Sequence, residues 1–277
     1  MVEVISSVGG NTIALFEDVG LSVKVLKQSL AVEVGIPRFR LRLLANNWAL
    51  EDNQSLTCQV VQLLILGFEP PDREIDQELM DASRRNDSRL LEMALSRPRN
   101  PNFEDVNGIT PLYEAALHGN LQCLSLLLEA GADKERGRSK RWLQDTPLFA
   151  AAQAGHQDIV RALLESLANP DHGRTDDEEH ETPLFIAAEE GHLGVVRLLL
   201  QYCANKDRGT RCDGETPLCI AAGKGHLDVV RLLLASGANI DQGTMQNGAT
   251  PLFRAASNGH LEVVQSLMES KANKDQA

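Results

Sequence analysis

The sequence predicts an α-rich solenoid of stacked helix pairs that is preceded by a small α+β domain. The tripeptide Thr-Pro-Leu occurs five times, at spacings of 36, 36, 34 and 34 residues. Each copy precedes two short apolar runs at helical spacing, which can bury their apolar sides only if neighbouring pairs stack. Residues 1–67 lack the repeat and contain β-type runs around one helical run. The five copies begin at Thr110, Thr146, Thr182, Thr216 and Thr250.

The fourth copy shows the local chemistry of one unit. Thr216 is a suitable N-cap, and Pro217 suits the first helical position, where its missing N–H would have no partner. Gly225 can end this helix in a left-handed conformation. A second helix is predicted from Asp228, with a wide apolar stripe, and Gly237 closes it.

The closing glycine of the second helix is replaced in three units. Leu167, Cys203 and Lys271 stand where Gly131 and Gly237 stand in other units. A left-handed turn is less favourable for a residue with a β-carbon. We therefore expect the array to be weakest at these three positions.

The pattern TPLxxAAxxGHxxVVxLLLxxGA resembles the ankyrin repeat, and five units match it. A sixth, degenerate unit precedes them: it lacks Thr-Pro and carries Arg84, Arg85 and Arg89, which suits a polar capping repeat. The resemblance implies an ankyrin-type α-solenoid with a projecting finger in each unit. It also implies that a protein ligand lies across the fingers and the first helices. The spacings of 36 place extra finger length at 136–145 and 171–181.

The N-terminal region has a ββαββ order. Strands are expected at 1–7, 12–16, 40–44 and 60–66, and a helix at 21–34. At Gly35-Ile36-Pro37 and Leu50-Glu51-Asp52 this order is similar to a ubiquitin-like (β-grasp) domain. The chain continues through Gly67-Phe68 instead of ending in a diglycine tail, so conjugation is not expected.

The ubiquitin-like resemblance places a surface patch on three residues. Alternatively, these are ordinary half-buried sheet residues. The patch residues are Val8, Leu44 and Leu64. The predicted domains are a ubiquitin-like domain at 1–67, a proline-containing linker at 68–72 and an ankyrin repeat domain at 73–277.

Composition limits the classes of partner. The net charge of −12 argues against nucleic acid and acidic membranes. No apolar run reaches the length of about 18 residues that spans a bilayer. The five cysteines form no CxxC pair, which favours a reducing compartment, and we expect a cytoplasmic monomer, with the nucleus also compatible.

The sequence offers no candidate for catalysis, a cofactor or a metal site. It has no nucleophile elbow, phosphate-binding loop or zinc-type CxxC. The histidines His156, His192, His226 and His260 recur once per unit, about 10 Å apart, too far to share a metal ion. We predict a structural role for them and a protein that is not an enzyme.

Candidate partner-binding residues lie where equivalent positions differ between units. In the ends of the first helices these are Leu117, His118, Gln153, Glu189, Glu190, Lys224, Ser257 and Asn258. In the basic finger they are Arg138, Lys140, Arg141 and Trp142, which could anchor a phosphate-rich or acidic peptide. An acidic finger follows one unit later. For the first helices, sequence drift at unconstrained surface sites would give the same variation. For the basic finger, the alternative is a mobile loop in which Trp142 packs on its own unit.

The predicted function is a non-enzymatic scaffold or adaptor that binds a partner protein through the fingers and the first helices. The alternative is an accessory recognition fragment of a larger signalling or ubiquitin-pathway enzyme whose catalytic domain lies outside this chain.

Overall fold

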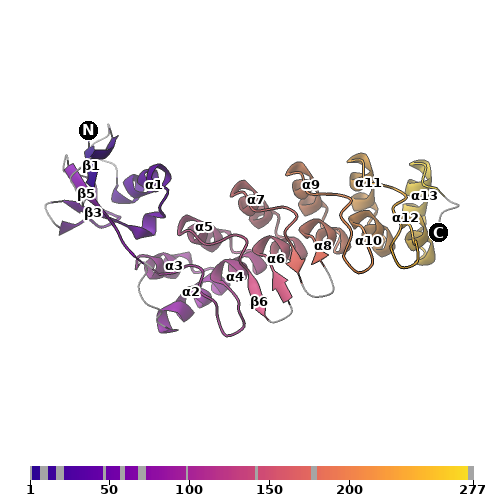
Figure 1. Cartoon of the computed structure of the whole chain (residues 1–277), viewed down its shortest axis with the longest axis horizontal. Coiled ribbons are helices and arrows are strands. Elements are labelled where there is room, and N and C mark those ends of the chain that lie inside the picture. The colour runs from indigo at the N-terminus through magenta and orange to yellow at the C-terminus, as the bar shows by residue number, and fades with distance from the viewer. Residues whose placement is uncertain are drawn as a thin grey trace.

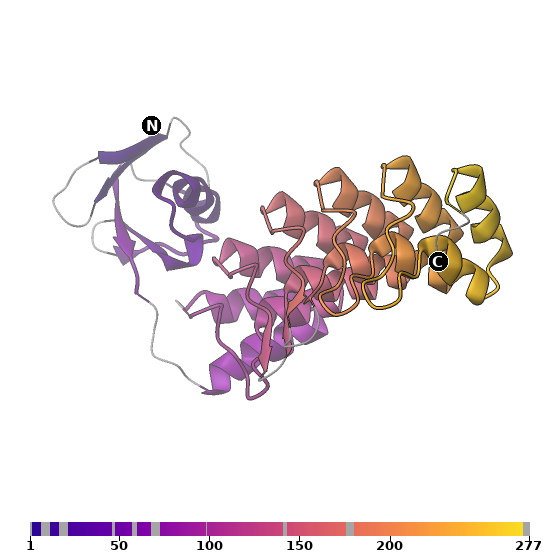
Figure 2. The ribbon, with the colours of Figure 1, turned by 45° about the vertical axis from the view of Figure 1, so that its right-hand side comes forward.

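The computed structural model describes residues 2–6, 12–16, 22–45, 48–56, 60–67, 73–97, 99–140, 143–175 and 180–273. Figure 1 shows a small α/β domain at one end of an elongated array of helix pairs, with the two termini at opposite ends. Figure 2 shows the same array turned, with the helix pairs stacked side by side along its length. None of the described helices is long and apolar enough to cross a membrane.

The N-terminal domain is one mixed sheet with one helix. Its strand order is β2-β1-β5-β3-β4, in which β1 and β5 are parallel and the other neighbours are antiparallel. The predicted ββαββ order is therefore confirmed, with one short strand added. The elements are β1 (Val2–Ser6), β2 (Thr12–Phe16), α1 (Val23–Val34), the 3₁₀ turn η1 (Arg38–Arg40), β3 (Leu41–Ala45), β4 (Trp48–Ala49) and β5 (Val60–Ile65).

Helix α1 covers one face of this sheet. Ser22 caps its first turn by accepting a hydrogen bond from the amide of Val25, and Gly35 ends it at a φ of 67°. Strand alternation places Leu41 and Leu43 in the core below α1. Leu44 and Leu64, two of the predicted patch residues, therefore lie on the opposite face of the sheet. The third, Val8, and the linker at 68–72 lie outside the described residues.

The array consists of six helix pairs in the part of the chain that the structure describes. The first helices of the pairs are α2 (Arg73–Arg85), α4 (Pro111–Leu117), α6 (Pro147–Ala154), α8 (Pro183–Glu189), α10 (Pro217–Lys224) and α12 (Pro251–Ser257). The second helices are α3 (Ser88–Leu95), α5 (Leu121–Glu129), α7 (Gln157–Glu165), α9 (Leu193–Gln201), α11 (Leu227–Ala235) and α13 (Leu261–Glu269). A single apolar core runs from α2 to α13, as stacking of short pairs requires.

The Thr-Pro pairs begin the first helices as predicted. The hydroxyl oxygen of each threonine accepts a hydrogen bond from the amide three residues later, at 3.1–3.3 Å. Each following proline occupies the first turn of its helix. The small side chains that follow are buried: Ala151, Ala187 and Ala221 are fully covered by neighbouring helices.

The repeated histidines connect one pair to the next. In each, Nε2–H donates to a backbone carbonyl of the preceding first helix, because a carbonyl can only accept. We call these contacts the histidine ladder: His156 to Leu117 at 3.1 Å, His192 to Gln153 at 3.0 Å, His226 to Glu189 at 2.8 Å and His260 to Gly223 at 2.9 Å. Asn120 makes the equivalent contacts, to Ser83 and Arg84. The predicted structural role of the histidines is confirmed.

A glycine lies under each ladder histidine. A β-carbon at Gly225 would lie 2.6 Å from Nδ1 of His260, and one at Gly191 would lie 2.7 Å from the ring of His226. These glycines also have positive φ, 82° and 75°. Both the close approach of the ring and the left-handed turn therefore require glycine.

The three predicted glycine replacements do adopt the left-handed conformation. Leu167, Cys203 and Lys271 have φ values of 64°, 62° and 68°. Leu167 is 82% exposed, so little packing offsets the strain of its turn. The predicted turn geometry is confirmed, and the associated loss of stability stays a prediction.

The longer fingers form a small sheet that the sequence does not predict. Its strands are β6 (Arg138–Lys140), β7 (Leu143–Asp145), β8 (Arg174–Thr175) and β9 (His180–Glu181), in the order β6-β7-β8-β9. Gln144 pairs with Thr175 and so joins the two fingers. Each insertion is a hairpin, and the two hairpins share one edge.

Gly225→Ala is expected to destabilise the array more than Gly259→Ala. Both residues have positive φ, but a β-carbon at Gly259 meets nothing within 4 Å, whereas one at Gly225 collides with His260. Strain alone costs about 1 kcal/mol, and the collision adds about 1–3 kcal/mol. Urea unfolding of both variants measures the difference. Equal losses would show that the ring contact does not contribute.

Leu167→Gly is expected to raise the free energy of unfolding by about 0.5–1 kcal/mol, because glycine removes the left-handed strain. The neighbouring Ser166, at a φ of −79°, provides the control: Ser166→Gly should lower stability by a similar amount. Thermal unfolding of both variants checks the signs. A lower melting temperature for Leu167→Gly would contradict the assignment of strain.

Candidate partner-binding surface

The predicted partner-binding residues of the first helices lie at equivalent places in successive pairs. Each is the last or next-to-last residue of its helix or the residue that caps it. Five are exposed: His118, Glu190, Lys224, Ser257 and Asn258. The partly buried ones are Leu117, Gln153 and Glu189. The repeat therefore places different side chains in a row along one face, which we call the inner face.

Charges on the inner face pair between neighbouring helix pairs. Lys224 lies 3.1 Å from Glu189 of the preceding pair. Glu114, which is 4% exposed, accepts hydrogen bonds from Arg84 of the preceding pair and lies 3.1 Å from His118. The exposed carboxylate of Glu190 forms no ion pair with any residue the structure describes. The inner face thus combines paired charges with a few that are available to a partner.

The basic finger is partly neutralised within the array. The carboxylate of Asp145, which is 3% exposed, pairs with Arg138 of its own hairpin and with Arg174 of the next, and accepts a hydrogen bond from the Tyr113 hydroxyl. Burial, with Asp145 adding to it, raises the pKa of Tyr113 to about 12. Arg174 also pairs with Glu181 at 3.0 Å. This network holds the finger sheet together.

The structure describes only part of the remaining basic and acidic fingers. Arg136 pairs with Glu104 at 2.7 Å, so a second basic residue of the finger is engaged. Lys140 ends β6, while Arg141, Trp142 and the acidic stretch at 176–179 lie outside the described residues. A role for Arg138, Lys140, Arg141 and Trp142 in partner binding stays a prediction.

The two buried cysteines among the described residues, Cys123 and Cys219, are poor nucleophiles. Burial raises the pKa of the Cys123 thiol to about 11 and that of Cys219 to about 12, with smaller contributions from Asp87 and Glu215 respectively. A thiol at such a pKa carries almost no thiolate near neutral pH. Among the described residues, no group of three His, Cys, Asp or Glu side chains could hold a metal ion.

Comparison with known proteins agrees with this architecture. The family model for ankyrin repeats matches residues 79–176, 137–209, 165–243 and 203–277, which together span 79–277. The chain belongs to the ankyrin repeat family. Ankyrin repeats are protein–protein interaction modules, so the array is a module of this kind.

Two solved ankyrin structures resemble the chain. The human ASB11 ankyrin repeat domain has 29% identity and a TM-score of 0.62, with 72% of this chain and 85% of that chain covered. An ankyrin repeat domain from Acinetobacter baumannii has 29% identity and a TM-score of 0.62, with coverages of 70% and 98%. Caskin-1 from Rattus norvegicus and from Mus musculus is 39% identical over 70 residues, and the match spans 21% of this chain and 5% of either relative.

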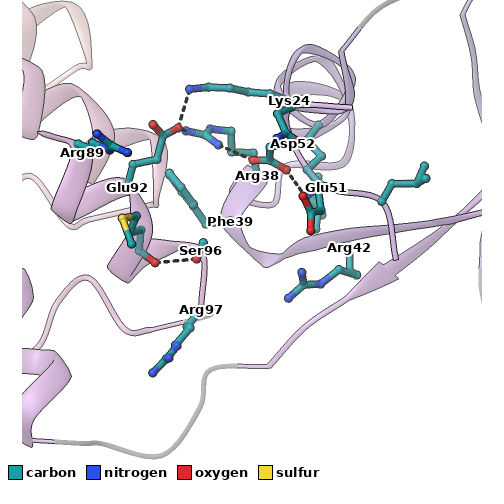
Figure 3. A pocket seen from close by; sticks show the side chains of 15 residues that line it. Lys24, Arg38, Phe39, Arg42, Glu51, Asp52, Arg89, Glu92, Ser96 and Arg97 are labelled. Atoms are coloured by element: carbon teal, nitrogen blue, oxygen red, sulfur yellow. Dashed lines mark hydrogen bonds and ion pairs between the residues drawn. The ribbon is translucent and has the colours of Figure 1, made fainter. Parts of the chain in front are cut away.

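The N-terminal domain contacts the ankyrin array through η1. Phe39 packs into the apolar core of the array instead of the core below α1. Pro37 lies against the end of α5: a β-carbon at Gly131 would lie 2.6 Å from Pro37 Cγ. Figure 3 shows the side chains on both sides of this junction.

Arg38 is the centre of the junction and is only 1% exposed. It donates hydrogen bonds to Asp52 of its own domain at 3.2 Å and to Glu92 of α3 at 3.0 Å (Figure 3). Its Nε lies 2.6 Å from Glu129 of α5, an ion pair without an aligned hydrogen bond. Its guanidinium also stacks 3.9 Å from the centre of the Phe39 ring.

Two lysines complete the charge balance of the junction. Lys24 donates to Glu92 and Lys27 donates to Asp52, each at 2.5 Å. The hydrogen bond from Lys24 lowers the pKa of Glu92, partial burial opposes the shift, and Arg38 adds to it. Three basic and three acidic side chains therefore neutralise one another, which a buried arginine requires.

Sequence reasoning did not find this junction. Arg38 and Glu92 are 54 residues apart and belong to different predicted domains, so no local pattern relates them. Arg89 was expected only as part of a polar cap, and Arg42 and Arg97 carried no motif. An arginine next to a phenylalanine in an otherwise aromatic-poor chain is the only local signal.

Gly131→Ala is expected to loosen the junction, and Gly237→Ala serves as its control. Both glycines close a second helix at positive φ, 82° and 76°, but the nearest atom to a β-carbon at Gly237 lies 3.8 Å away. Each variant should lose about 1 kcal/mol to strain. Only Gly131→Ala should speed hydrogen exchange in η1, and Pro37→Ala should partly reverse this in the double variant. Unchanged exchange in η1 would contradict the contact.

Proposed function

We propose that the chain is a non-enzymatic scaffold or adaptor, cytoplasmic and monomeric, whose inner face and fingers hold a partner protein. The observation that carries this proposal is the contrast between the buried core positions of the repeat, which we call its frame, and the inner-face positions. Equivalent frame residues such as Leu148, Leu184 and Leu218 are buried and identical, whereas the inner-face residues differ in size and charge and five of them are exposed. A rigid row of dissimilar side chains suits recognition of one asymmetric partner.

The N-terminal domain is proposed to be ubiquitin-like and to provide a second contact. One helix on a mixed five-stranded sheet supports this assignment. Leu64 is 37% exposed on the sheet face opposite α1, where a partner could reach it. Because its Arg38 is fixed to α3 and α5, the domain would present this face in a defined direction relative to the inner face.

The test is affinity purification with a charge-reversed inner face. Glu190→Lys with Lys224→Glu leaves the net charge unchanged and alters two exposed inner-face residues. Glu165→Lys with Arg197→Glu makes the same exchange on exposed positions of the second helices α7 and α9 and is the matched control.

Proteins captured by the wild type and by the control should be lost from the inner-face variant, with binding weakened by about tenfold or more. Thermal unfolding confirms that both variants fold. Equal capture by both variants would show that the ligand does not lie on the inner face.

A further inference from the structure

A cleft of about 750 Å³ opens beside the junction, between the N-terminal domain and the first helix pair. This volume lies within the range of about 300–1,000 Å³ that ligand pockets have. Six basic and three acidic side chains line it, in a chain whose net charge is −12. The cleft is therefore a local positive region on an acidic protein.

Three arginines in this cleft are not neutralised by an ion pair to any described residue. The carboxylates of Asp52 and Glu92 are already engaged by Lys24, Lys27 and Arg38. Arg42, Arg89 and Arg97, in contrast, form no ion pair with any residue that the structure describes, and Arg89 and Arg97 are exposed. We call the site the arginine cleft.

The three arginines come from both walls of the cleft. Arg42 lies on β3 of the N-terminal domain, while Arg89 lies on α3 and Arg97 follows α3 (Figure 3). The junction through Arg38 and Phe39 fixes these walls relative to each other. The arrangement is preformed, so a ligand that contacts both walls loses little free energy to ordering the protein.

Apolar side chains lie between the charges. Leu50 and Phe39 line the cleft from the N-terminal domain, and Met93 lines it from α3 with 63% of its surface exposed. Methionine adapts to ligands of varied shape, which makes an exposed one favourable in a binding surface. A ligand that fits must therefore carry negative charge together with apolar groups.

We propose that the arginine cleft binds an acidic peptide segment of a partner protein, in which carboxylates alternate with apolar side chains. Arg42 would hold a carboxylate on one wall and Arg89 and Arg97 would hold carboxylates on the other, each able to form paired hydrogen bonds. Apolar side chains of the peptide would cover Met93 and Leu50. A nucleic acid is disfavoured by repulsion from the acidic remainder of the chain. This site is separate from the inner face and does not depend on it.

The test uses a short fluorescein-labelled peptide that alternates glutamate with leucine, and a matched peptide with lysine in place of glutamate. Fluorescence anisotropy with the full chain measures both. The glutamate peptide should bind and the lysine peptide should not. The variant Arg42→Gln/Arg89→Gln/Arg97→Gln should raise Kd about tenfold or more. Its fold should be retained, because these side chains form no internal ion pair, and thermal unfolding checks this.

The control variant Arg161→Gln/Arg197→Gln/Arg231→Gln removes the same charge from exposed positions on α7, α9 and α11 and should leave Kd unchanged. Arg42→Gln alone and Arg89→Gln/Arg97→Gln alone should each weaken binding, because the ligand spans both walls. Loss from one wall only, equal loss in the control, or no binding by the wild type would overturn the proposal. Competition by inorganic phosphate at micromolar concentration would also overturn it, since the ligand would then be a free anion.

Discussion

The histidine ladder is the contact on which the shape of the array depends. An isolated pair of helices of seven to nine residues, such as α4 and α5, cannot bury its apolar stripe. The contact of each histidine with the carbonyl of the preceding first helix sets the distance between pairs. The glycine beneath the ring sets how closely they approach. Because the same two features recur from α4 to α13, equivalent ends of the first helices lie side by side, and the inner-face residues form a row.

The sequence predicted the array well because its information is local and repeated. Thr-Pro at each helix start, glycine or its replacement at each end, and the apolar stripes all lie within one unit. The left-handed turn at Leu167 followed from comparison with Gly131 alone. The inner-face positions were predicted in the same way. Once the buried residues of one unit are assigned, the surface positions between them are assigned in every unit.

What the sequence did not predict depends on contacts between distant segments. The finger sheet forms because Gln144 pairs with Thr175. The sequence of neither insertion indicates that the two hairpins pair with each other. Arg138 was expected on the surface for a partner, yet the buried carboxylate of Asp145 engages it. The junction through Arg38 depends on three carboxylates that come from separate elements. Such charge networks need the folded geometry before their members can be recognised.

The position of Phe39 in the core of the array has a consequence for synthesis. The N-terminal domain leaves the ribosome first, and Glu92 of α3, which pairs with Arg38, follows 54 residues later. At about 5–20 residues per second, α3 arrives roughly 3–11 seconds after Arg38. During this interval Arg38 lacks its hydrogen bond to Glu92, and Phe39 lacks the apolar core of the array into which it packs. The nascent domain therefore carries an uncovered aromatic side chain until the helix pairs that contact η1 have emerged.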